Sequence, residues 1–150
     1  MAAFAPCRTA AVTRIATLLS LLLVLLVAAL PVQASRKGDR LQQAQYAYSA
    51  AIRWNDFEGA WSLVDPAFRD AHPKSELEFE RYKQIQVSSY RDRPPQPVGK
   101  DEVRRDVEIG VINRHTMAER TVRYVEHWRY DAKAKSWWLV NGLPDFWAGQ

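Results

Sequence analysis

The chain has 150 residues, of which 47% are hydrophobic and 25% are charged, and its formal net charge is +4 at pH 7. This length allows one domain, or one domain with an export signal, and it excludes a multidomain protein. The composition excludes a disordered polyelectrolyte and a polytopic membrane protein. Basic and acidic residues are interleaved along nearly every segment, so no concentrated basic face is expected and nucleic acid is excluded as a partner.

Residues 1–34 show the three zones of a secretory signal peptide. A start with Arg8 and Arg14 and no acidic residue is followed by an apolar run over 15–30 and a short segment that ends at Ala34. We predict cleavage after Ala34, a single domain over 35–150, a periplasmic location and no membrane attachment after cleavage. Secretion and anchoring by an uncleaved signal stay open as alternatives, since the apolar run approaches the length of a membrane span.

Three segments place apolar residues three and four positions apart, which predicts three helices. The first carries the stripe of Leu41, Ala44 and Tyr48, and Asp65-Pro66 is expected to end the second. Ser75 begins a capping box that opens the third helix. The predicted helices span 40–54, 55–64 and 75–83. Two tryptophans at helical spacing, Trp54 and Trp61, are expected in the core.

After Ile85 the hydrophobic pattern changes to alternation, which predicts antiparallel strands. Strands are predicted at 85–91, 101–114, 119–130 and 136–143. The proline-rich segment 93–99 is predicted to be a loop, because proline cannot donate to a strand ladder.

One acidic residue, Glu126, falls on the apolar side of its predicted strand, between Tyr124 and Trp128. A two-residue connection at 116–117 would place Val107 opposite Glu126. An unpaired carboxylate in a dry core is costly, so this position predicts a polar partner, a water molecule or a cavity next to Glu126.

The last predicted strand is apolar on both sides, because the adjacent residues Trp137 and Trp138 must point to opposite faces. Its outer side therefore needs a cover. The tail 143–147 and a second copy of the chain, forming a homodimer, fit equally well.

Helices followed by long antiparallel strands with an aromatic last strand resemble the nuclear transport factor 2-like superfamily. The resemblance is carried by Val122-Arg123-Tyr124-Val125-Glu126-His127-Trp128-Arg129-Tyr130 followed by Trp137-Trp138-Leu139-Val140. It implies an α+β fold with N-terminal helices packed on a curved antiparallel β-sheet that forms a cone-like pocket. Enzymes of this superfamily place acids, tyrosines or histidines on the concave face of the sheet.

The resemblance implies ligand-binding candidates in Glu126, Tyr124, Tyr90 and Trp128. Glu126 is also the candidate catalytic residue, as a general base whose pKa is raised by burial. The alternative is that Glu126 is a structural acid bonded to a tyrosine or an arginine. One further tyrosine, Tyr46 or Tyr48, could face the same pocket.

No metal site and no cofactor are expected. The histidines His72, His115 and His127 lack the short spacing of zinc or iron ligands, and no glycine-rich phosphate loop or nucleophile elbow occurs.

The first functional hypothesis is therefore an exported, non-catalytic domain that binds a small apolar ligand or a periplasmic protein. The alternative is an isomerase, dehydratase or cyclase with Glu126 as base. A weaker alternative is an immunity or assembly factor that uses the outward tryptophan at 137 or 138.

Overall fold

The computed structural model describes residues 30–147, and the chain divides into two units, Met1–Asp39 and Arg40–Gln150. Helix α2 (Leu30–Arg53) begins in the first unit, and the second unit carries the other helices and the sheet. The predicted signal segment lies outside the described residues except for its last five positions, which belong to α2. No helix in the described part of the chain is long and apolar enough to span a membrane.

Within residues 30–147, four helices precede the sheet, and three of them lie at the positions predicted from the sequence. They are α2, α3 (Phe57–Ser62), α4 (Pro66–Ala71) and α5 (Glu76–Tyr82). Asp56 caps α3 by accepting a hydrogen bond from the Gly59 amide at 2.8 Å. The capping box at the start of α5 is present, since Ser75 and Glu78 bond reciprocally to each other's backbone amides.

Helix α4 was not predicted, because Pro66 was interpreted only as the end of the preceding helix. Pro66 instead occupies the first turn of α4, where the missing amide proton costs no intrahelical hydrogen bond. The Asp65 side chain caps this turn by accepting a hydrogen bond from the Ala67 amide at 2.9 Å. Helix α3 ends earlier than predicted, at Ser62 with Leu63 as its C-cap, so this dipeptide opens α4 and does not form the end of α3.

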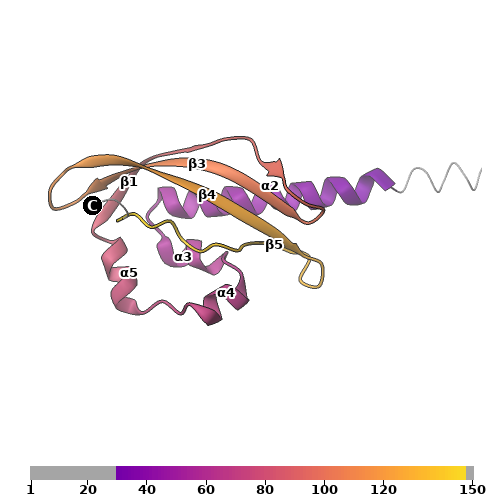
Figure 1. Ribbon diagram of the computed structural model, residues 1–150, viewed down its shortest axis with the longest axis horizontal. Coiled ribbons are helices and arrows are strands. Elements are labelled where there is room, and N and C mark those ends of the chain that lie inside the picture. Colours follow the sequence, from indigo (N-terminus) through magenta and orange to yellow (C-terminus); the bar gives the residue numbers. More distant parts are fainter. Residues whose placement is uncertain (1–29, 148–150) are drawn as a thin grey trace, which may run out of the picture. The chain divides into compact units, whose positions relative to one another are not determined.

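The sheet is antiparallel, with strand order β1-β3-β4-β5 and with α2 packed against one face (Figure 1). Its strands are β1 (Ile85–Asp92), β3 (Glu102–Asn113), β4 (Glu119–Asp131) and β5 (Ser136–Leu139). The α+β fold class predicted from the sequence is thus confirmed. The prediction of a loop over 93–99 is wrong at β2 (Gln96–Pro97), which pairs with Arg104 and Val103 of β3. Proline is tolerated there because β2 pairs with β3 alone.

A β-bulge between Val87 and Ser89 interrupts the pairing of β1 with β3. Gly110 lies opposite this bulge, and a Cβ atom on it would come within 2.5 Å of the Ser88 and Ser89 hydroxyl oxygens. A bulge bends its strand and increases the local twist, so these residues help to curve the sheet around the helices.

The hairpin between β3 and β4 has a different register from the predicted one. Val107 pairs with Tyr124, and Arg105 pairs with Glu126. The ladder continues to a hydrogen bond from the Asn113 amide to the Ala118 carbonyl oxygen at 2.9 Å, so the connection is longer than the predicted two residues. A shift by two residues keeps each side chain on its predicted face but changes its partner across the strands.

The tail after β5 packs on the helices and not over the outer face of β5. Phe146 is fully buried, and its ring lies 5.7 Å from that of Phe57 and 5.9 Å from that of Tyr82. Trp137 points inward and is buried, whereas Trp138 is half-buried. The prediction of a core position is wrong for Trp54, which is 83% exposed at the end of α2.

Candidate functional site

Glu126 lies on β4 and points into the interior between the sheet and α2. Glu126 is fully buried, and Trp128, two residues further along the same face, is 1% exposed. Tyr48 of α2 covers Trp128 edge-on, with ring centroids 5.8 Å apart. Indole and phenol rings therefore fill the interior beside the acid.

The Glu126 carboxylate is bonded by four donor groups of the protein. Arg105 donates from Nε at 2.9 Å to Oε2 and from Nη2 at 3.0 Å to Oε1. The Trp128 indole Nε1 donates to Oε2 at 2.7 Å, and the Tyr90 hydroxyl donates to Oε1. We call these four residues, Glu126, Arg105, Trp128 and Tyr90, the buried network. Its central carboxylate has no unused acceptor position that faces a cavity.

Burial raises the pKa of Glu126 above its ordinary value of 4.5, while the Arg105 charge and the three bonded side chains oppose this rise. Burial likewise raises the pKa of Tyr90, with the charge of Glu126 as the second cause. The phenol therefore stays protonated and serves as a donor to the carboxylate. The electrostatics stabilise a fixed arrangement of charges, with Arg105 balancing Glu126.

The buried network reaches the surface through Arg105, and Tyr90 borders a hollow beside β1. Arg105, which is 5% exposed, also donates from Nη1 to the Asp92 carboxylate at 3.1 Å. The Asp92 side chain is 42% exposed at the end of β1. The guanidinium thus connects a buried acid with a partly exposed one.

Of the residues predicted to bind a ligand, three lie in the buried network: Glu126, Tyr90 and Trp128. Tyr124 lies beside them, but its hydroxyl donates to the Gly142 carbonyl oxygen at 2.6 Å. Tyr48 is fully buried nearby, whereas Tyr46 is 71% exposed. Whether any of them binds a ligand stays a prediction.

Arg105 was missed as a site residue although the sequence carried a signal for it. It occupies the same side of its strand as the apolar residues Val103 and Val107, where a charged side chain is unexpected. Two charges of opposite sign on the inner sides of neighbouring strands indicate a buried ion pair. Their direct pairing also follows from the observed register.

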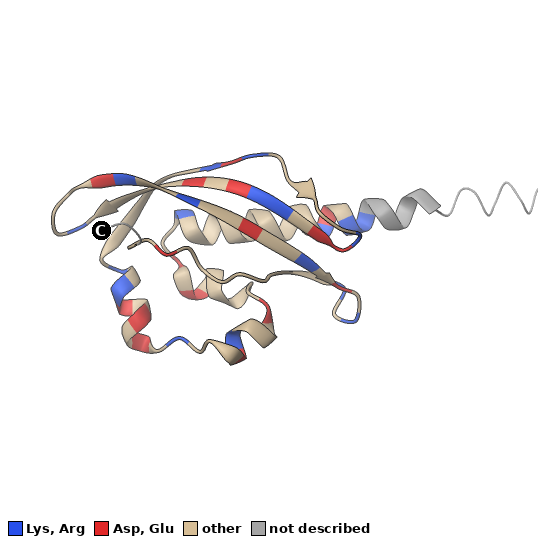
Figure 2. Cartoon of the chain, viewed as in Figure 1, with Lys and Arg blue, Asp and Glu red and all other residues tan. Residues whose placement is uncertain are grey.

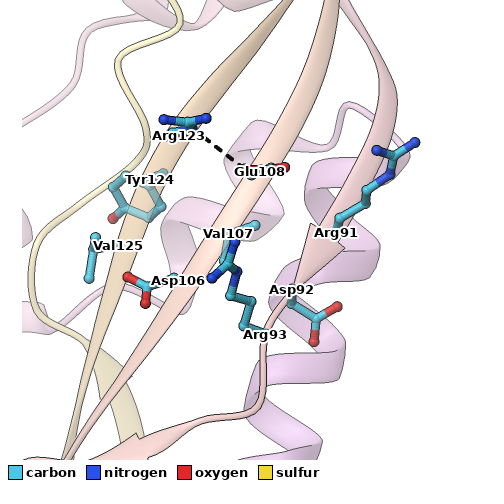
Figure 3. Close-up of a pocket in the computed structure, with 9 residues that line it drawn as sticks. All are labelled: Arg91, Asp92, Arg93, Asp106, Val107, Glu108, Arg123, Tyr124 and Val125. Atoms are coloured by element: carbon cyan, nitrogen blue, oxygen red, sulfur yellow. Dashed lines mark ion pairs between the residues drawn. The ribbon is translucent and has the colours of Figure 1, made fainter.

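A second candidate site is a groove of about 420 Å³ on the opposite, outer face of the sheet (Figure 3). We call it the outer groove. Its lining consists mainly of charged residues from β1, β3 and β4 and the segment after β1. The lining residues are Arg91, Asp92, Arg93, Asp106, Val107, Glu108, Arg123, Tyr124 and Val125.

Charges of both signs follow β3 and β4 (Figure 2), and two acids of the outer groove, Asp106 and Glu108, have a basic partner. Arg104 bonds Asp106 at 2.9 Å, and Arg123 lies 3.5 Å from Glu108. Within residues 30–147, no three histidine, cysteine, aspartate or glutamate side chains gather in a group that could hold a metal ion.

Two further hollows border α2. One of about 590 Å³ lies beside β5 and includes Ala44, Leu63 and Trp138 in its walls. Another of about 420 Å³ lies beside β1 and includes Trp54 and Val87. Both are lined more by apolar side chains than the outer groove is.

Comparison with known proteins found no matching family model and no matching curated protein. The chain is similar in structure to a ketosteroid isomerase-like protein from Erwinia carotovora atroseptica SCRI1043, with a TM-score of 0.46 and 17% identity over 68% of this chain and 89% of that one. It is also similar to a candidate dehydratase of the NTF2-like family from Streptomyces avermitilis, with a TM-score of 0.41 and 14% identity over 69% and 90% of the two chains.

These similarities are too distant to carry an inference about activity. In this chain the fold consists of N-terminal helices followed by a curved antiparallel sheet. Function must therefore be argued from the site itself.

Proposed function

We propose that the protein is an exported, non-catalytic domain that binds another protein through its outer surface. The main observation is the state of Glu126, whose carboxylate is inaccessible to water and bonded by four donors. A general base must come within hydrogen-bond reach of the proton that it abstracts. In this arrangement the protein itself occupies the positions that a substrate would need.

The same observation argues against a small apolar ligand between the sheet and α2. Such a ligand needs an open apolar pocket, usually of several hundred Å³. Around Glu126 this space is filled by Trp128 and Tyr48, each at most 1% exposed. The available hollows lie on the surface, where a protein partner can reach them.

The surface offers features that are common in protein interfaces. Trp54 is 83% exposed, and tryptophan is enriched among residues that dominate binding energy. The outer groove adds arginines, which are also enriched at interfaces. Export is supported by the signal-like pattern of residues 1–34.

A second candidate, an isomerase or dehydratase with Glu126 as base, is favoured by one observation. Tyr48, Tyr90 and Tyr124 lie near Glu126, since each of their pKa values is raised partly by its charge. An acid among phenols could transfer protons if the interior opened. This candidate requires Arg105 to release the carboxylate.

Native mass spectrometry of the protein purified from the periplasm separates these functions. Under the main proposal, we expect a protein partner bound in a fixed ratio and no small molecule retained. A small apolar molecule retained by the wild-type protein would contradict the proposal, as would purification of the chain alone in every condition tested. The Glu126→Gln variant is the control: its partner binding should persist, whereas a retained substrate would be turned over only by the wild type.

A further inference from the structure

The outer groove has a regular arrangement of charges that follows from the strand register. On the outer face, Glu108 pairs with Arg91 on one side and with Arg123 on the other, and this forms a row across three strands. In the next row the Arg93 amide donates to the Asp106 carbonyl oxygen at 3.0 Å, and Asp106 pairs with Val125. Figure 3 shows these side chains around the groove.

The acids of the groove are already engaged by arginines, whereas two arginines are not engaged by acids. Asp106 is bonded by Arg104, and Asp92 is bonded by Arg105. Arg91 and Arg93 form no ion pair within residues 30–147, and both are exposed. The groove therefore has a local excess of positive charge, although its lining contains as many acids as arginines.

The spacing of these two arginines defines the shape of a ligand. Arg91 and Arg93 are two residues apart along a strand and its continuation, so their side chains leave the same face about 6.6 Å apart. An extended peptide repeats its side chains on one face at the same distance. Two acidic residues separated by one position would therefore match the spacing at which these two arginine side chains leave the backbone.

We propose that the outer groove binds an extended acidic segment of the protein partner, with two acidic side chains at positions i and i+2 directed at Arg91 and Arg93. This inference rests on the proposed protein-binding function and adds the site and the chemistry of the partner. Arg123, whose guanidinium lies 3.5 Å from Glu108, balances this acid within the groove and leaves Arg91 and Arg93 for the ligand. Val125 supplies a half-buried apolar surface beside the charges.

The experiment uses two peptides of identical composition, Gly-Ser-Glu-Ser-Glu-Ser-Gly and Gly-Ser-Ser-Glu-Glu-Ser-Gly, and inorganic phosphate as a third probe. Each probe is titrated at low ionic strength into ¹⁵N-labelled protein while the arginine Nε–Hε signals are followed. We expect the first peptide to bind several-fold more tightly than the second, because adjacent acids of an extended chain point to opposite faces. Its binding should weaken as salt is added.

The variant Arg91→Glu/Arg93→Glu should lower the affinity for the first peptide at least tenfold. The matched control Lys133→Glu/Lys135→Glu changes the net charge by the same amount at a turn outside the groove, and it should keep wild-type affinity. Equal binding of the two peptides, equal losses in both variants, no binding to the wild type, or binding of phosphate as tight as that of the first peptide would each overturn the proposal.

Photo-crosslinking to the co-purified partner separates failure of this inference from failure of the proposed function. A photoreactive residue at position 125 should capture the partner, and one at position 54 serves as the comparison. Capture at position 54 alone would overturn the outer groove as the site and leave the protein-binding function standing. The absence of capture at both positions, together with no partner in native mass spectrometry, would count against both.

Discussion

The two faces of the sheet differ in how their charged side chains are buried and paired, although alternating residues of the same strands form both faces. Inside, Arg105 and Glu126 are bonded to each other and are at most 5% exposed. Outside, one position away on β3, Arg104 pairs with Asp106, and both side chains are more than 40% exposed. Inside, the Glu126 carboxylate accepts hydrogen bonds from four donor groups, whereas the outer face keeps Arg91 and Arg93 without an ion pair among the described residues. This difference favours a structural role inside and a binding role outside.

The largest expected effect follows from breaking the inner pair. Glu126→Gln should lower the free energy of unfolding by up to about 3–5 kcal/mol, because the buried Arg105 charge then keeps only its bond to the partly exposed Asp92 carboxylate. Chemical denaturation measured by fluorescence of the tryptophans would show the loss. Arg104→Met, on the outer face of the same strand, is the control and should cost less than about 1 kcal/mol.

Replacing both inner partners sharpens this test. Arg105→Met/Glu126→Leu removes the two charges together, and its loss should be smaller than the sum of the two single losses, although it leaves the Trp128 indole and the Tyr90 hydroxyl without their acceptor. An additive loss in the double variant would show that the two side chains do not act as a pair. Preserved partner binding in this variant would confirm that the inner face is not the binding surface.

A second expected effect is a pH dependence that belongs to Glu126. Its folded pKa is raised by burial, so on raising the pH above 4.5 the unfolded chain loses this proton before the folded protein does. The stability of the wild type relative to Glu126→Gln should therefore fall in that window, by at most about 1.4 kcal/mol per pH unit. Urea denaturation of both proteins from pH 4 to 8 measures the difference. A difference that does not change with pH would mean that Arg105 fully offsets the effect of burial.

The elements of the fold were largely predictable because their signals are local. Alternation identified the strands, and the Ser75 capping box identified the start of α5. Two elements were missed where proline was interpreted only as a break, at Pro66 in α4 and at Pro97 in β2. Proline is also compatible with a first helical turn or an edge pairing, and sequence alone does not show which context applies.

The site was predicted only in part because it depends on pairing between strands. Glu126 was identified from its position on an apolar face, but its partner was assigned through a turn that was too short. Two additional residues in the turn place Arg105, instead of Val107, opposite Glu126. The acid therefore forms an ion pair instead of facing a cavity. Loop length sets the register, and the residues 114–118 carry no sharp signal for it.

The smallest expected effect concerns the buried hydroxyl of Tyr48. Tyr48 is fully buried, and within the described residues its hydroxyl makes no hydrogen bond of regular geometry, although it lies close enough to the Tyr124 hydroxyl to oppose the rise of that group's pKa. The Tyr90 hydroxyl, in contrast, donates to Glu126. Tyr48→Phe should therefore leave the free energy of unfolding within about 1 kcal/mol of wild type, while Tyr90→Phe should lower it by about 1–3 kcal/mol. Denaturation of the two variants under identical conditions compares the same chemical change at two buried sites. A larger loss from Tyr48→Phe would show that this hydroxyl also bonds inside the protein.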